Sequence, residues 1–167
     1  MSAPVPVPGS DVVVRPAVRA DAPAYLALIQ ALADFEKLAG PDEAARTRLV
    51  EDAFGPTPRY EVLVAELAGD VVAYAIFFPT YSTFRARQSL YLEDIFVHPR
   101  ARRRGVASAM MKHLEQLARA RGCGRFEWTV LDWNTDAQKL YDGLGAQALK
   151  QWMVYRIDLP DPPASQD

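Results

Sequence analysis

The chain has 167 residues, of which 50% are hydrophobic and 24% are charged. This length and balance fit one globular domain and exclude a disordered chain, a coiled coil and a collagen-like repeat. The net charge of −2 argues against a general nucleic-acid binder, whose domain would be strongly basic. A single cysteine, Cys123, excludes an intrachain disulfide framework and a metal site built from several cysteines.

The first third of the chain predicts one strand and two helices. Residues 12–15 (VVVR) are typical of a strand. Asp21 is expected to cap the next helix, with Pro23 in its first turn. That helix should end at Gly40-Pro41, and a second, weaker helix is expected over 42–54. The apolar side chains of the first helix repeat at helical spacing: Tyr25, Leu28, Ile29, Leu32 and Phe35.

The middle of the chain predicts three extended segments. Residues 60–67 and 71–78 are rich in β-forming side chains, and Ala68-Gly69-Asp70 between them predicts a hairpin. A polar loop is expected over 79–87. Residues 89–98 form a third extended run, which a proline ends.

The last third predicts helices and strands in alternation. A helix is expected from Val106 to Gly122, a strand over 125–131, a helix over 135–144 ended by Gly145, and a last strand over 152–159. The complete order predicts a mixed α/β sheet with a βαβ unit in its second half, and such a unit must cross over right-handed.

The two ends of the chain differ from the rest in composition. Residues 1–10 and 160–167 are rich in proline, and we expect disordered tails around a domain over 11–159. The longest apolar run, Val71–Phe78, is far shorter than the roughly 18 residues that a membrane span requires. The start lacks the cationic and apolar regions of a secretory signal, so a cytoplasmic location and no membrane partner are expected.

The junction between the third extended run and the following helix carries the pattern Arg102-x-x-Gly105-x-Ala107. Small residues at 105 and 107 allow a tight turn and the close approach of a ligand. The N-terminus of the helix presents free N–H groups and a positive dipole end. Arginines beside such a turn suit a pyrophosphate. A solvated basic loop and a nucleic-acid patch are the alternatives.

With this loop between a strand and a helix, the sequence resembles the GNAT superfamily of N-acetyltransferases. It is most similar to the diamine acetyltransferase branch, with its spermidine/spermine and thialysine acetyltransferases, and more to the latter. The resemblance covers about Val13 to Ile157 and implies a central, mostly antiparallel sheet flanked by helices, acetyl-CoA as co-substrate and a homodimer. Five ordered segments carry it: LADFEKL (32–38), TYSTF (80–84), YLEDIFV (91–97), VLDWN (130–134) and LYDGLGAQ (140–147).

The resemblance also implies where acetyl-CoA binds. The main chain of Ile95, Phe96 and Val97 would pair with the pantetheine arm, and an N–H there would polarise the thioester carbonyl. Without the resemblance, the apolar side chains of these three residues would indicate only that they belong to the hydrophobic core. Asn134 would contact the cofactor or cap its helix. The pyrophosphate would lie on the loop and the first helical turn, at Arg102, Arg103, Arg104, Gly105, Val106, Ala107 and Ser108.

Acetylating an amine requires a free lone pair, so a cationic substrate must first lose a proton. Glu93, nine positions before Arg102 on the preceding strand, is the residue that we expect to bind and deprotonate the amine. Asp94 would face the other way on a regular strand, but a bulge would re-aim both side chains. The alternative for both is a pair of solubilising charges. Tyr141 matches the family tyrosine that protonates the departing thiolate, and its alternative is a packed helix residue.

Substrate selection is predicted from fewer residues. Phe35 and Glu36 match the amine-binding pair of the branch, and Trp152 matches an aromatic residue near its active site. Lys150-Gln151 stands where the branch has an acidic segment, and Ser82 where the polyamine enzyme has an aspartate. Because fewer carboxylates attract a long polycation less, these departures favour a short amine over spermidine or spermine.

Several functions are therefore open from the sequence. The first is an acetyl-CoA-dependent N-acetyltransferase for the primary amine of a small molecule such as thialysine, lysine or a diamine. The alternatives are a protein-lysine or antibiotic-amine acetyltransferase, a non-catalytic CoA-binding module, and a nucleic-acid binder using Arg100 to Arg104. His98 and His113 have no third ligand nearby in the sequence, so we expect no metal.

Overall fold

The computed structural model describes residues 5–6 and 11–159 of the chain. The chain divides into two compact units, with the boundary between Leu131 and Asp132, whereas the sequence predicts a single domain. Most of the two predicted tails lies outside the described residues. Within the N-terminal tail, however, Val5–Pro6 pairs with the next strand instead of being disordered. No helix in the described part of the chain is long and apolar enough to cross a membrane.

The described residues of the first unit form a six-stranded sheet, three α-helices and two short 3₁₀ segments. In chain order these are β1 (Val5–Pro6), β2 (Val12–Pro16), η1 (Arg19–Asp21), α1 (Ala22–Glu36), α2 (Glu43–Phe54), β3 (Glu61–Leu67), β4 (Asp70–Ser82), β5 (Arg87–Val97), η2 (Pro99–Ala101), α3 (Val106–Ala120) and β6 (Phe126–Trp128).

The strands follow one another across the sheet in the order of the sequence. Neighbouring strands are antiparallel except for β5 and β6, which run parallel over Leu90–Leu92 and Phe126–Trp128. The helix α3 joins these two strands, which confirms the predicted βαβ unit. β6 is shorter than the strand predicted over 125–131. It comprises three residues, Phe126–Trp128, and all three pair with β5. The mostly antiparallel mixed sheet confirms the predicted fold class.

The turn between β3 and β4 shows how the local sequence sets the register. Ala68 and Gly69 both have positive φ angles, 53° and 87°, the conformation of a two-residue hairpin turn. Leu67 therefore pairs with Asp70, and β4 begins one residue before the predicted strand. Glycine at 69 adopts this angle without steric cost.

The polar loop predicted over 79–87 is wrong for most of its length. β4 continues through Pro79 to Ser82, and β5 starts at Arg87, so only a short turn separates the two strands. A proline usually ends a central strand because it lacks an N–H. Beyond Phe77, however, β4 no longer pairs with β3 and becomes an edge, where proline is tolerated.

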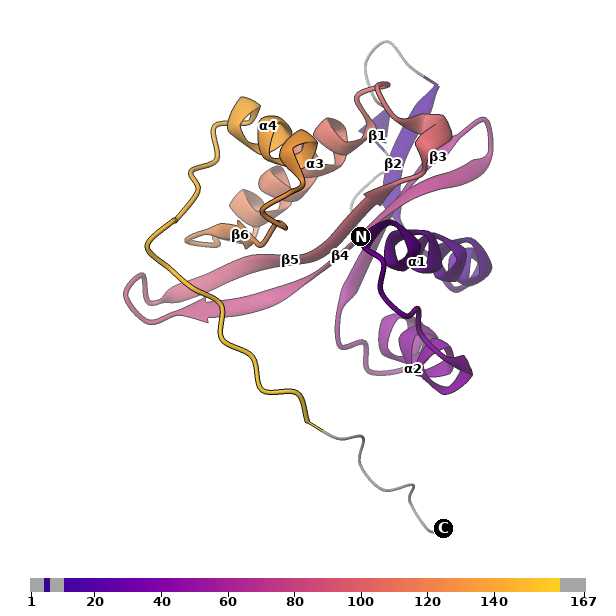
Figure 1. Cartoon of the computed structure of the whole chain (residues 1–167), viewed down its shortest axis with the longest axis horizontal. Coiled ribbons are helices and arrows are strands. Elements are labelled where there is room, and N and C mark those ends of the chain that lie inside the picture. The colour runs from indigo at the N-terminus through magenta and orange to yellow at the C-terminus, as the bar shows by residue number, and fades with distance from the viewer. Residues whose placement is uncertain (1–4, 7–10, 160–167) are drawn as a thin grey trace. The chain divides into compact units, whose positions relative to one another are not determined.

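The two faces of the sheet bury different helices, and Figure 1 shows α1 and α2 on one side of the strands and α3 on the other. Alternate residues of a strand face opposite sides, so Leu63 and Ala65 belong to the α3 face. The C-terminal end of α3 lies on that face too, with the Arg121 guanidinium 5.9 Å from the ring centre of Phe77. The core under α1 consists of Tyr25, Leu28, Val62, Val64, Tyr74, Ile76 and Phe96.

The ends of α1 differ from the prediction. The Asp21 side chain does not cap the helix; it accepts hydrogen bonds from Arg15 at 2.8 and 2.9 Å and from the Val18 N–H. The bonds from Arg15 lower the pKa of the Asp21 carboxyl. The helix ends at Glu36, four residues before Gly40, because the next residue, Lys37, has a left-handed φ of 58°. By contrast, α2 begins where predicted, with the Asp42 carboxylate accepting from the Ala45 N–H.

The second unit contains α4 (Thr135–Gly143) and the segment that follows it. The helix agrees with the prediction and is followed by Gly145 at a φ of 82°. The strand predicted over 152–159 is wrong, because these residues have no assigned secondary structure and their side chains are exposed. A strand is stable only when paired, and the described residues of this unit, 132–159, include no other strand.

Candidate active site

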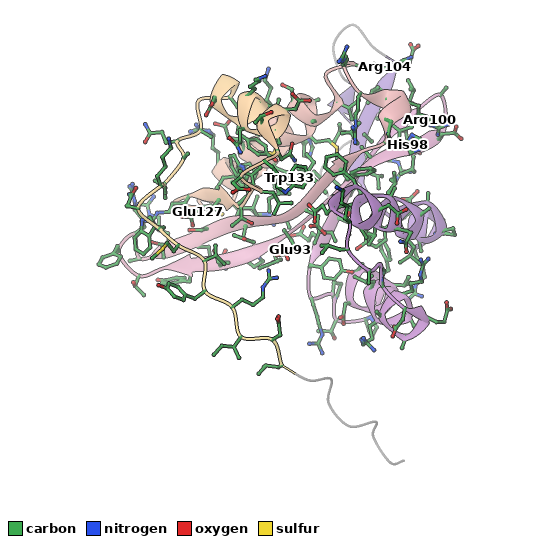
Figure 2. All side chains as sticks on the ribbon, viewed as in Figure 1. Glu93, His98, Arg100, Arg104, Glu127 and Trp133 are labelled. Carbon is green, nitrogen blue, oxygen red and sulfur yellow. The ribbon has the colours of Figure 1, made fainter. Side chains whose placement is uncertain are left out.

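A β-bulge in β5 places the predicted catalytic carboxylate. Ile76 pairs with Asp94 and Phe77 with Leu92, so Glu93 is the extra residue between two consecutive pairs. Leu92 is buried with Phe77 on the α3 face, while Asp94 lies beside Ile76 on the α1 face. Without the bulge, residues 92 and 94 would share one face. The structure thus confirms the expectation that a bulge re-aims this pair; Glu93 is exposed on β5 (Figure 2).

Asp94 on β5 lies within electrostatic range of two other carboxylates, Glu93 beside it on the strand and Glu36 at the end of α1. Asp94 is largely buried, and this burial, followed by the charges of Glu93 and Glu36, raises the pKa of its carboxyl to about 6. The Tyr74 hydroxyl acts in the opposite direction and lowers it. The structure therefore brings together three of the predicted substrate-binding residues, Glu36, Glu93 and Asp94, which we call the acidic cluster.

The acidic cluster has no cationic partner in the described part of the chain. The ion pairs there involve other acids, such as Asp21 and Glu66 with Arg15, or Glu61 with Arg121. Like charges at close range raise each other's energy unless a cation joins them. A partly buried group of carboxylates that forms no ion pair with arginine or lysine among the described residues is therefore suited to bind a cation from solution.

The loop after β5 has the backbone geometry of an anion site. Arg103 and Gly105 both have left-handed φ angles, 61° and 74°, and α3 begins directly afterwards at Val106. No side chain caps this helix, and the first N–H groups of a helix have no partner within it. Arg103 and Arg104 are exposed beside these groups, and Figure 2 shows Arg104 on the segment between β5 and α3. Donors of this kind fit a pyrophosphate.

The Arg102 side chain has a different position from its neighbours. Its Nε donates to the Val97 carbonyl at 3.0 Å, and its guanidinium lies 5.4 Å from the ring centre of Phe35 and 5.6 Å from that of Phe96. It therefore joins the end of α1, with the predicted substrate pair Phe35-Glu36, to the end of β5. Binding of the pyrophosphate by this guanidinium stays a prediction.

The outer edge of β5 is open along its second half in the described strands. β6 pairs with β5 only over Leu90–Leu92, so the main chain from Glu93 to Val97 has a strand partner on the β4 side alone. This open edge includes Ile95, Phe96 and Val97, and a ligand with amide groups can pair with it as a strand does.

The remaining predicted residues lie in the second unit. The Asn134 side chain caps α4 by accepting from the Ala137 N–H at 3.3 Å. Tyr141 is half-buried on α4, and burial raises the pKa of its phenol, which keeps it protonated as a proton donor must be. Trp152 is 74% exposed within the extended segment. Catalysis by Tyr141 and substrate contact by Trp152 stay predictions.

Other polar residues have local structural roles. Ser82 is buried and its hydroxyl accepts from the Arg85 N–H at 3.3 Å, in the turn between β4 and β5. His98 accepts from the Arg100 N–H through Nδ1, and burial lowers the pKa of His113 in α3. No group of three or more metal-ligating side chains is found among the described residues.

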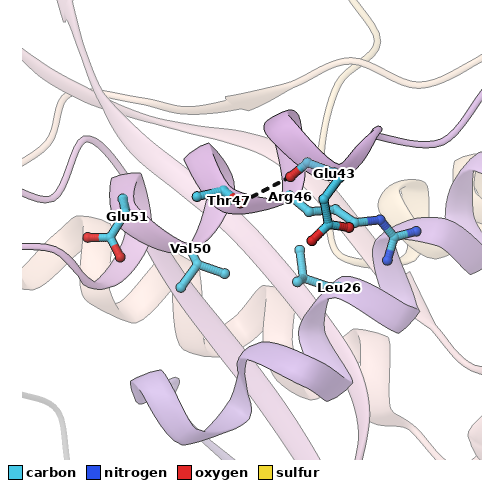
Figure 3. Close-up of a pocket in the computed structure, with 6 residues that line it drawn as sticks. All are labelled: Leu26, Glu43, Arg46, Thr47, Val50 and Glu51. Carbon is cyan, nitrogen blue, oxygen red and sulfur yellow. Dashed lines mark hydrogen bonds between the residues drawn. The ribbon is translucent and has the colours of Figure 1, made fainter.

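A hollow of about 390 Å³ between α1 and α2 is separate from the acidic cluster (Figure 3). Two of its charged groups are already engaged, since Arg46 donates to Gln30 and Glu51 accepts from Arg19. It contains none of the predicted site residues and is lined by Leu26, Glu43, Arg46, Thr47, Val50 and Glu51.

The fold agrees with comparison to known proteins. The sequence profile of the Acetyltransferase (GNAT) family matches residues 26–146, and the chain belongs to this family of N-acetyltransferases. It is similar to AAC(6')-Iy in complex with the bisubstrate analogue CoA-S-monomethyl-acetylneamine, with a TM-score of 0.75 and 21% identity over 90% of this chain and 100% of that one. This likeness shows the fold.

Curated relatives point to a more particular group. The chain is 37% identical to the thialysine N-epsilon-acetyltransferase of Bos taurus over 158 residues, which cover 88% of this chain and 92% of the relative. It is also 37% identical to the L-ornithine N5-acetyltransferase of Arabidopsis thaliana over 102 residues, 60% of this chain and 45% of that protein. These similarities confirm the resemblance seen in the sequence.

The cofactor loop can be tested with two glycines of similar geometry. Gly105 and Gly69 both have positive φ angles and open space where a Cβ would stand. Valine at either position should cost about 1–2 kcal/mol of folding free energy, because the left-handed region disfavours a Cβ. We expect only Gly105→Val to weaken acetyl-CoA binding, by about tenfold, since its side chain would stand at the anion site.

Calorimetric titration with acetyl-CoA and thermal melts of both variants would measure this. An equal affinity loss in Gly69→Val would attribute the effect to general destabilisation. Unchanged affinity in Gly105→Val would remove this loop from the cofactor site.

Proposed function

We propose that the chain acetylates the primary amine of a short cationic molecule related to thialysine, lysine or ornithine. The observation that carries this proposal is the acidic cluster, which lies beside an open strand edge and has no cation of its own among the described residues. The names of the relatives support it, because they acetylate thialysine and ornithine. In this proposal Phe35, Trp152 and the three carboxylates bind the amine.

Glu93 is the proposed general base. It attracts the ammonium and accepts its proton, which leaves a lone pair on nitrogen for attack on the acetyl carbonyl. Acetyl-CoA supplies the activated acetyl thioester when bound. A main-chain N–H of Ile95, Phe96 or Val97 donates to the carbonyl oxygen, Arg102 to Ser108 and Asn134 hold the cofactor, and Tyr141 gives its proton to the departing sulfur. The N–C bond forms as the C–S bond breaks.

The distribution of carboxylates limits the length of the substrate. A spermine molecule carries several separated ammonium groups, and each needs its own negative partner. Ser82 has no charge and its hydroxyl is used in a turn, and Lys150-Gln151 supplies no carboxylate. Each missing partner removes about 1 kcal/mol of attraction where the site is partly exposed. The proposed substrate is therefore a short amine.

A panel of acceptors with acetyl-CoA, followed by release of free thiol, tests this function. Thialysine, lysine and ornithine should have a higher kcat/KM than spermidine and spermine, and also than an aminoglycoside or a histone-tail peptide. The panel should be repeated at 20 and 200 mM salt, because the Debye length falls from roughly 20 to 7 Å over this range. The KM of the short amines should rise only modestly. The highest kcat/KM for spermine, the aminoglycoside or the peptide would refute the substrate class.

We further propose that the protein works as a homodimer in the cytoplasm. The resemblance to the diamine acetyltransferase branch supports the dimer, as do the exposed large apolar side chains of the C-terminal segment. These are Trp152, Met153, Val154, Tyr155, Ile157 and Leu159. The acidic net charge agrees with a small-molecule enzyme that has no nucleic-acid partner.

A further inference from the structure

Three tyrosines lie under the acidic cluster, between α1 and the sheet. Tyr25 of α1 and Tyr74 of β4 are fully buried, and Tyr60 precedes β3. The rings of Tyr25 and Tyr74 meet edge to face, with centres 5.5 Å apart and planes at 81°. This packing fixes the direction in which the Tyr74 hydroxyl points.

The hydrogen bonds of the other two hydroxyls can be assigned. The Tyr60 hydroxyl donates to the Leu49 carbonyl at 2.6 Å, which uses its one proton. The contact of 3.1 Å between Tyr25 and Tyr60 must therefore be a donation from Tyr25. Both protons are directed away from the acidic cluster.

The Tyr74 hydroxyl is the exception. It is buried and has no hydrogen-bond partner in the described part of the chain. Tyr74 pairs with Phe96 across β4 and β5, and Asp94 pairs with Ile76 two residues away on the same face, so Tyr74 and Asp94 are diagonal neighbours. A buried hydroxyl without a partner costs free energy, and the Asp94 carboxylate is an acceptor on the same face of the sheet.

We propose that Tyr74 is a positioning residue of the amine site, whose hydroxyl donates to Asp94 and keeps that carboxylate charged and oriented toward the substrate ammonium. This inference rests on the proposed function for the role of Asp94. Without a donor, the negative charges of Glu36 and Glu93 and the buried surroundings would favour the protonated acid. A protonated Asp94 would not attract a cation.

The groups that face Asp94 set the expected pH dependence. They are Glu36 and Tyr25 on α1, Tyr74 on β4 and Glu93 on β5. Only Tyr74 lowers the pKa of Asp94, while burial, Glu93 and Glu36 raise it. Removing the Tyr74 hydroxyl should therefore move the titration of Asp94 to higher pH, and the loss should affect amine binding below neutral pH.

The test is a carbon-13 NMR titration of the Asp94 carboxyl in the wild-type chain, Tyr74→Phe and Tyr25→Phe. We expect a midpoint near pH 6 in the wild type. It should be about one pH unit higher in Tyr74→Phe, which is a tenfold change in the ionisation equilibrium, and unchanged in Tyr25→Phe. The KM for thialysine at pH 6 should rise about five- to tenfold in Tyr74→Phe and converge with the wild type at pH 9, with an unchanged KM for acetyl-CoA.

An unchanged midpoint in Tyr74→Phe, or an equal shift in Tyr25→Phe, would overturn the proposal. If Tyr74→Phe does not fold, the chemical shift of the Tyr74 Cζ provides a second test. In the wild type this shift should change at the pH where Asp94 titrates. In Asp94→Asn that change should be absent. A wild-type Cζ shift that shows no such change would also overturn the proposal. Because the titrations need neither substrate, an expected shift together with an inactive amine panel would refute the proposed function while upholding the Tyr74–Asp94 pair.

Discussion

Glu93→Gln should lower the turnover of acetyl transfer by about 10²–10⁴-fold, the usual contribution of a general acid–base group. Glutamine keeps the size of the side chain but cannot take the proton from the ammonium. Because Glu93 is exposed at a bulge, its replacement should leave the melting temperature nearly unchanged. The affinity for acetyl-CoA should also be unchanged, since the side chain lies outside the cofactor loop. Single-turnover kinetics with saturating acetyl-CoA would measure the chemical step.

Glu127→Gln is the matched control for this experiment. Glu127 lies on the neighbouring strand β6, where its carboxylate is 3.7 Å from Arg125 (Figure 2). Its replacement should change turnover by less than a factor of about two, as expected for an exposed ion pair. A wild-type rate in Glu93→Gln, or equal losses in both variants, would remove Glu93 from the mechanism.

Asp94→Asn should make the protein more stable at neutral pH and less able to bind its amine. Asp94 has a pKa of about 6 in the folded chain against an ordinary value of 3.8. A raised pKa means that folding favours the protonated form of this carboxyl. The stability of the folded chain is therefore highest below about pH 4, where Asp94 is protonated, and falls as the pH rises through 6 and Asp94 becomes charged. Above that range the charged carboxylate costs up to roughly 3 kcal/mol, which the neutral, isosteric asparagine avoids.

Denaturant unfolding at pH 4 and pH 8 would test this stability effect. The free energies of unfolding of Asp94→Asn and the wild type should agree at pH 4, and the variant should be higher by about 2–3 kcal/mol at pH 8. Asp34→Asn, on the exposed side of α1, is the control and should show no such pH-dependent gain. A variant that is less stable than the wild type at pH 8 would show that the Asp94 charge is compensated in the folded protein.

The sequence predicted those elements whose pattern is complete within a short segment. The apolar spacing of α3 is local and the helix is found where expected, and α2 likewise begins within one residue of its predicted start. The extent of β4 beyond Pro79 was missed because it depends on where β3 stops pairing. The alternation over 152–159 indicates a strand, but a strand needs an edge to pair with, and the segment itself does not supply one.

The same distinction applies to the site. Glu93 and the Arg102 to Ser108 loop belong to a contiguous motif, so the sequence alone suffices to predict them as site residues, and their roles stay predictions. The proposed positioning role of Tyr74 was not predicted, because a tyrosine in an apolar strand indicates only a residue of the hydrophobic core. Its nearness to Asp94 follows from the register of β4 and β5 at the bulge. The position of the Arg102 side chain between Phe35 and Phe96 likewise depends on packing between segments far apart in sequence.

The proposed function requires the acidic cluster to receive the substrate ammonium. A crystal structure of the chain with a bisubstrate analogue, in which CoA is joined through sulfur to the side-chain nitrogen of thialysine, would test this most directly. We expect the amine nitrogen within hydrogen-bonding distance of Glu93, directly or through one water, with Asp94 and Glu36 facing the substrate and the diphosphate on the first turn of α3. An amine placed away from all three carboxylates, with the diphosphate still on that turn, would contradict it.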